Sequence, residues 1–70
     1  MEISISKLVE KTISGNYPDA VKFDGVLYYP DETNKTYVNI YGVNLWSRLI
    51  GAVEDGTPVS ELKLEVFGWK

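Results

Sequence analysis

The chain has 70 residues, enough for one small domain (residues 1–70) and too few for two domains that fold unaided. Hydrophobic residues make up 44% of it and charged residues 24%, the composition of a globular protein rather than a disordered one. The absence of cysteine and histidine excludes disulfides, thiolate or imidazole metal sites, and Cys or His nucleophiles. The net charge of −3 disfavours general binding to phosphate backbones.

The N-terminal segment predicts neither a targeting signal nor a membrane anchor. Residues 1–6 include Glu2 and lack the unbroken apolar run of a signal peptide. No window of the sequence approaches the roughly 20 apolar residues that span a bilayer. We therefore expect a soluble, cytoplasmic protein without a membrane partner.

The first predicted element is a helix over about 5–14. Ser4 or Ser6 can accept a backbone N–H at its start, and Gly15 can adopt the left-handed conformation just after its end. Apolar residues recur at helical spacing, and Lys7, Glu10 and Lys11 fall on the other side. The residues expected to pack on a sheet are Ile5, Leu8, Val9 and Ile13.

Three strands are predicted next, over residues 20–23, 26–29 and 36–40. Asp24 and Gly25 separate the first two, and this dipeptide favours a type I′ turn because both central positions need positive φ. The polar segment 30–35 forms a wider second turn. The result is a three-stranded antiparallel meander.

A second, shorter helix and a closing strand complete the predicted fold. Asn44 can cap the helix, whose apolar face contains Leu45, Trp46, Leu49, Ile50 and Val53. The strand alternates Leu62, Leu64 and Val66 with charged residues. The order α-β-β-β-α-β predicts an α+β domain in which two helices cover one face of a mostly antiparallel sheet of three to four strands.

This succession of elements resembles a loose group of short proteins encoded by bacteriophages and prophages of Gram-positive bacteria. The resemblance rests on the hairpin segment 21–28, the acidic turn after it, the Leu45-Trp46 pair and the closing strand 61–66. It implies a phage protein acting in the cytoplasm of a bacterial host. The group has no agreed activity, so the resemblance assigns no functional residue.

No catalytic or cofactor motif stands out in the sequence. The Ser4–Lys7 spacing matches S-x-x-K, but a serine-rich helix start explains it. The carboxylate pairs at 31–32 and 54–55 lie in turns, where acidic residues are common. No phosphate-binding glycine motif is present. We therefore expect a non-enzymatic protein with neither cofactor nor metal.

Aromatic residues are abundant for so small a domain, at 13% of the chain. In one interpretation they border the core and keep their polar tips in water; in the other they form an exposed patch with the composition of an interface hot spot. Continued alternation after Val66 places Phe67 and Trp69 together on the sheet face that the helices leave open. The candidate binding residues are Tyr28, Tyr37, Tyr41, Trp46, Phe67 and Trp69.

Two hypotheses of function follow. The first is a small protein-binding module, such as a phage accessory protein that binds and modulates a host protein, for example in host defence, or that self-associates as a homo-oligomer. The alternative is binding of single-stranded nucleic acid by stacking on Tyr28, Tyr37 and Phe67. The acidic balance of the chain opposes this alternative.

Overall fold

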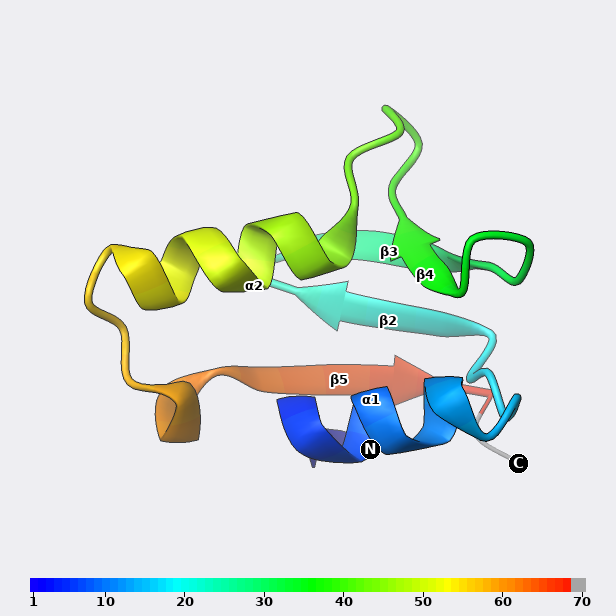
Figure 1. Ribbon diagram of the computed structural model, residues 1–70, viewed down its shortest axis with the longest axis horizontal. Helices are drawn as coiled ribbons and strands as arrows, with labels where there is room; N and C mark the ends of the chain where they lie inside the picture. Colours follow the sequence, from blue (N-terminus) through cyan, green and yellow to red (C-terminus); the bar gives the residue numbers. More distant parts are fainter. Residues whose placement is uncertain (69–70) are drawn as a thin grey trace.

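The computed structural model describes residues 1–68 as two helices on one face of a five-stranded antiparallel sheet (Figure 1). The strands lie side by side in the order β1-β5-β2-β3-β4. The elements in chain order are β1 (Glu2–Ser4), α1 (Ile5–Ile13), β2 (Ala20–Phe23), β3 (Val26–Asp31), β4 (Thr36–Val38), α2 (Leu45–Glu54), a 3₁₀ turn η1 (Val59–Glu61) and β5 (Lys63–Phe67). The predicted α+β class is confirmed.

The predicted count of three to four strands is too low because β1 is missing from it. This strand has only three residues and pairs with β5 at the opposite end of the chain, with Ile3 opposite Leu64. The Val66 N–H also donates to the Met1 carbonyl oxygen at 2.7 Å. A pairing between the two ends of a chain has no local sequence signal, and the last residue of β1 already caps α1.

Helix α1 begins and ends close to its predicted bounds. Ser4 caps it by accepting the Lys7 N–H at 3.3 Å, and Gly15 follows at a φ of +82°. The prediction that Val9 and Ile13 pack on the sheet is wrong: they are 37% and 76% exposed. Each follows a buried residue, Leu8 and Thr12, by one position and so lies about 100° further round the helix.

The β2–β3 hairpin confirms the predicted type I′ turn. Asp24 and Gly25 have φ angles of +52° and +78°, and the strands pair with Val21 opposite Tyr28. Strand β4 ends at Val38, two residues before its predicted end. The next residue, Asn39, turns the chain into a loop, because its side-chain oxygen accepts two backbone N–H groups.

Helix α2 is tied to the sheet through its cap. Asn44 Oδ1 accepts the Trp46 N–H at 2.8 Å and the Thr36 hydroxyl at 3.0 Å, so one side chain both starts the helix and holds it against β4. The buried positions of α2 are Leu45 and Leu49. The other half of its apolar face is left uncovered.

The core lies between the helices and one face of the sheet. Its buried members are Leu8, Val21, Tyr28, Tyr37, Leu45, Leu49, Leu64 and Val66. Strand alternation sends the neighbours of these residues to the opposite face, which no element covers within residues 1–68 (Figure 1). We call this the open face.

Candidate binding surfaces

An apolar row crosses four strands on the open face. Strand β5 pairs with β2 so that Phe67 lies opposite Ala20, and β3 pairs with β4 so that Tyr29 lies opposite Val38. The β2–β3 register brings Tyr29 across from Ala20. We call these four residues the open-face row. Because Ala20 is small, a notch separates the rings of Phe67 and Tyr29, whose strands lie about 10 Å apart.

The loop between β4 and α2 adds two exposed apolar side chains beside this row. Ile40 and Tyr41 are 78% and 84% exposed, and Figure 1 shows the loop projecting beyond the sheet. Two hydrogen bonds within the loop stabilise it, because Asn39 Oδ1 accepts the N–H groups of Tyr41 and Val43, each at 2.9 Å. Together with Leu27 and Tyr29, the loop borders a shallow apolar hollow of about 310 Å³.

A second apolar surface lies on the helical side of the molecule, between α1 and α2. The helices run in opposite directions (Figure 1), and two hollows of about 300 and 250 Å³ follow one another between them. Trp46 is half-buried there, and its ring lies edge-on to the Tyr37 ring with the two centroids 6.5 Å apart. We call this surface the inter-helix groove. Its walls are Ile5, Val9 and Ile13 on α1 and Trp46, Ile50 and Val53 on α2, and Val59 lies at one end.

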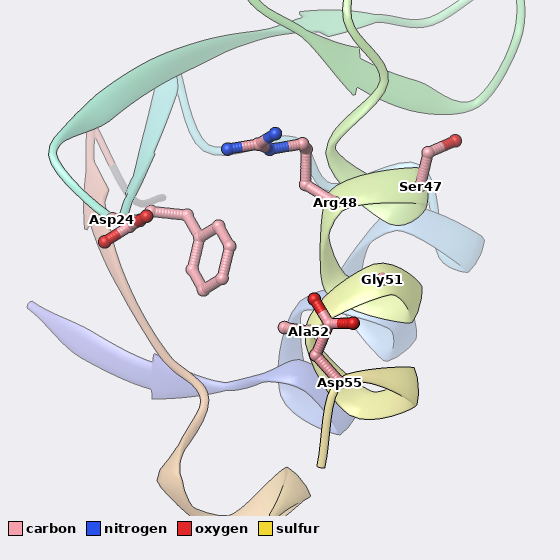
Figure 2. Close-up of a pocket in the computed structure, with 7 residues that line it drawn as sticks. Asp24, Ser47, Arg48, Gly51, Ala52 and Asp55 are labelled. Atoms are coloured by element: carbon pink, nitrogen blue, oxygen red, sulfur yellow. The ribbon is translucent and has the colours of Figure 1, made fainter. Parts of the chain in front are cut away.

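A fourth hollow, of about 310 Å³, is more polar and lies between α2 and the β2–β3 turn. Figure 2 shows Arg48 on α2 and Asp55, the residue after the end of α2, on one side of it, and Asp24 on the opposite wall. It exists because Gly51 and Ala52 present almost no side chain to the hairpin. Arg48 makes no ion pair with a described residue, and the hollow contains no nucleophile paired with a base.

The structure separates the candidate residues chosen from the sequence. Tyr28 and Tyr37 are 1% and 0% exposed, so placing them in an exposed patch is wrong. Both point toward the helices, because β3 and β4 present these positions to the core face. Trp46 is half-buried, as its place at the margin of the α2 stripe predicts. Tyr41 and Phe67 are exposed. Trp69 lies outside the described residues.

The Tyr37 hydroxyl has a structural role instead. It donates to the Pro18 carbonyl oxygen at 2.8 Å and thereby ties β4 to the segment after α1. Burial, reinforced by the nearby Tyr17, Asp19 and Glu32 side chains, raises the pKa of Tyr37 above its ordinary value. A buried, protonated donor of this kind holds the fold together and leaves no ring free to meet a ligand.

Several exposed apolar residues were not identified from the sequence as surface residues. Leu27, Tyr29 and Ile40 belong to the open face and its loop. Val9, Ile13, Ile50 and Val53 were assigned to apolar helix faces, but the sheet covers only part of each face. One signal was available in the sequence: each helical stripe spans more positions than a single row of core contacts needs.

Within residues 1–68, no group of three or more Asp, Glu, His or Cys side chains could hold a metal ion. Neither helix in the described part of the chain has both the length and the apolar character needed to cross a membrane. Comparison with known proteins found no matching family model, no matching curated protein and no matching solved structure.

Proposed function

We propose that this protein is a small, non-enzymatic binding module that docks a partner protein on the open face of its sheet. The observation that carries the proposal is the open-face row beside the Ile40–Tyr41 loop. Isolated exposed apolar residues are ordinary on protein surfaces, whereas a contiguous group built on adjacent strands is typical of an interface.

The open face is already ordered for binding. The ladder pairs of four strands fix the positions of the row, and the Asn39 hydrogen bonds hold the loop in one conformation. A partner therefore loses little affinity to the ordering of this surface. Tyr29, Tyr41 and Phe67 supply large rings with few rotatable bonds, the type of side chain that dominates binding energy.

The charges on the open face favour a protein partner over a nucleic acid. Lys22 lies between Glu65 and Leu27 in the register, and Lys63 pairs with Glu2 at 3.6 Å. These charges balance and offer no basic track for a phosphate backbone. The stacking platform of Tyr28, Tyr37 and Phe67 is not formed, because the first two rings are buried on the other face. We therefore do not retain the nucleic-acid alternative.

The resemblance to short phage and prophage proteins supports a host protein as the partner. In this proposal the module acts as an accessory protein that binds and modulates a bacterial host factor. A second copy of the chain is the other occupant that this surface suits.

Site-specific photo-crosslinking tests the proposal. A photoreactive amino acid replaces Tyr41 in one variant and Lys7, an exposed position on α1, in a matched control, and both are expressed in a Gram-positive bacterium. We expect an adduct from position 41 and none from position 7. Adding Tyr29→Asp to the position-41 variant should lower the yield of its adduct at least about fivefold, the effect of losing about 1 kcal/mol of binding energy.

The composition of the adduct identifies the partner. Peptides of a second protein indicate a host factor, and peptides of this chain alone indicate self-association. Equal adducts from positions 41 and 7, or a yield that Tyr29→Asp leaves unchanged in a folded variant, would contradict docking on the open face.

A further inference from the structure

We infer that the inter-helix groove is a second docking site and that it receives a basic amphipathic helix of a partner protein. The groove lies on the helical side of the sheet, so this inference does not depend on the open face.

The walls repeat at helical spacing on both sides. On α1 the apolar side chains are four residues apart, at Ile5, Val9 and Ile13. On α2 they are four and then three residues apart, at Trp46, Ile50 and Val53. Ile13 and Ile50 are 76% and 58% exposed. The α1 wall is about 12 Å long, a little over two turns of helix. A helix with an apolar stripe at i, i+3, i+4 and i+7 presents ridges of matching period.

An occupant of this groove has to satisfy its own backbone hydrogen bonds. The groove is formed by apolar side chains of two helices, whose backbone groups are already paired internally. An extended peptide in it would therefore bury N–H and C=O groups without hydrogen-bond partners, which is unfavourable. A helix pairs these groups internally, so the groove favours a helix over a strand.

The charges along the rim of the groove favour basic residues beside the apolar stripe of the bound helix. Glu10 follows Val9 on the solvent side of the α1 wall, and Glu54 lines the groove on α2. The other rim positions along the two helices, Ser6 and Ser47, are uncharged, and Lys35 lies at one end of the groove. Lysine or arginine beside the apolar stripe would meet both carboxylates. A second copy of this chain would instead bring acidic rim against acidic rim.

The two ends of the groove define the direction of the bound helix. Lys35 lies at the end formed by Ile13 and Trp46, and Glu54 lies at the other end near Val59. A helix carries partial positive charge at its N-terminus and partial negative charge at its C-terminus. The favourable orientation places the N-terminus of the guest beside Glu54 and its C-terminus beside Lys35, parallel to α1.

Titration of the isotope-labelled protein with synthetic peptides of about 14 residues, four helical turns, tests the inference. The basic peptide carries a leucine stripe flanked by lysines, and the acidic peptide carries the same stripe flanked by glutamates. A scrambled basic peptide has the same composition without the stripe. We expect amide shift changes confined to Val9, Ile13, Ile50 and Val53 and their neighbours, with at least tenfold tighter binding of the basic peptide. This advantage should shrink in salt of about 0.5 M, which screens the rim charges.

Three variants fix the location. Ile13→Ser, which removes an apolar contact at a 76% exposed position without adding a charge, should weaken binding of the basic peptide at least tenfold. The double variant Glu10→Lys/Glu54→Lys should reverse the preference in favour of the acidic peptide. Leu27→Asp, on the open face, should leave peptide binding unchanged even though it alters the surface of the proposed function.

The orientation is tested with a spin label on either end of the basic peptide. A label at the N-terminus should broaden signals near Glu54, and a label at the C-terminus should broaden those near Lys35. Absence of binding at about 1 mM peptide, equal affinity for the two charge types, binding of the scrambled peptide, or shifts on the open face would each overturn the inference. The reversed broadening pattern would overturn the assigned direction.

Discussion

Replacement of Tyr37 by phenylalanine isolates one buried hydrogen bond. The Tyr37 hydroxyl donates to the Pro18 carbonyl oxygen at 2.8 Å, and both residues are buried. The ring contacts to Tyr17 and Trp46, with centroids 6.1 and 6.5 Å away, do not involve the hydroxyl. The substitution Tyr37→Phe therefore keeps the packing and leaves the Pro18 carbonyl without its donor.

We expect this change to lower the free energy of unfolding by about 1–3 kcal/mol, the range for a buried polar group left unpaired. For a chain of this length the unfolding entropy near the midpoint is about 0.15 kcal/mol/K. The melting temperature should fall by about 7–20 °C, measured by thermal denaturation followed by circular dichroism. Tyr41→Phe, which removes an exposed hydroxyl, is the matched control and should leave the melting temperature unchanged.

The dependence on pH gives an independent readout. Burial raises the pKa of Tyr37 in the folded state, whereas the unfolded chain ionises near the ordinary value of about 10. Above that pH the unfolded state loses a proton that the folded state keeps, so the stability contributed by this group is present below pH 10 and lost as pH rises. The loss approaches about 1.4 kcal/mol per pH unit, and Tyr37→Phe cannot show it.

The free energy of unfolding of the unsubstituted protein should therefore approach that of Tyr37→Phe above pH 10, as measured by chemical denaturation. A melting temperature that falls by less than about 3 °C in the variant, well short of the range set by the entropy of unfolding, would show that the hydrogen bond contributes little. A stability difference that stays constant from neutral pH to about pH 11 would refute the raised pKa.

Three further substitutions test the packing and the turns. Leu8→Ala truncates a fully buried side chain and should cost about 2–5 kcal/mol in urea denaturation, whereas Ile13→Ala should stay within about 0.5 kcal/mol; equal losses would mean that the face of α1 is assigned wrongly. Gly25→Val forces a β-branched residue to a φ of +78° and should destabilise the hairpin, with broadened β2–β3 amide signals; unchanged stability would refute the type I′ turn. Gly51→Ala adds a methyl group where no atom lies within 4 Å and should raise stability by about 0.5–1 kcal/mol through helix propensity; a lower melting temperature would show that the hollow beside α2 is closed in solution.

The helix and turn boundaries could be predicted because the capping and turn-forming residues that produce each boundary lie within a few positions of it. Ser4 and Asn44 cap their helices with side-chain oxygen atoms that accept backbone N–H groups two or three residues further along the chain. Asp24 and Gly25 define a hairpin because their own backbone conformations match the twist of the strands beside them. The end of β4 was misplaced, although Asn39 and Gly42 are turn-forming residues, because the apolar Ile40 and Tyr41 continue the appearance of a strand.

The binding surfaces could be predicted only in part. Alternation requires Tyr28 and Tyr29 to point to opposite faces, and Phe67 to point away from Val66. It does not state which face meets the helices, so alternation alone cannot tell that Tyr28 is buried and Tyr29 exposed. The apolar stripes of α1 and α2 were identified correctly, yet their width does not reveal which half is covered.

The α+β class, the two helices, the hairpin and the alternation of each strand follow from the amino-acid sequence, because propensity, capping and periodicity act over short distances along the chain. The pairing of β1 with β5, the burial of Tyr28 and Tyr37 in the core, and the two apolar surfaces on opposite sides follow from the packed fold alone. Burial depends on what packs against a residue. In this chain several of those partners lie far along the sequence, because Ile3 pairs with Leu64 and the Tyr37 hydroxyl bonds to Pro18, and no local pattern indicates such contacts.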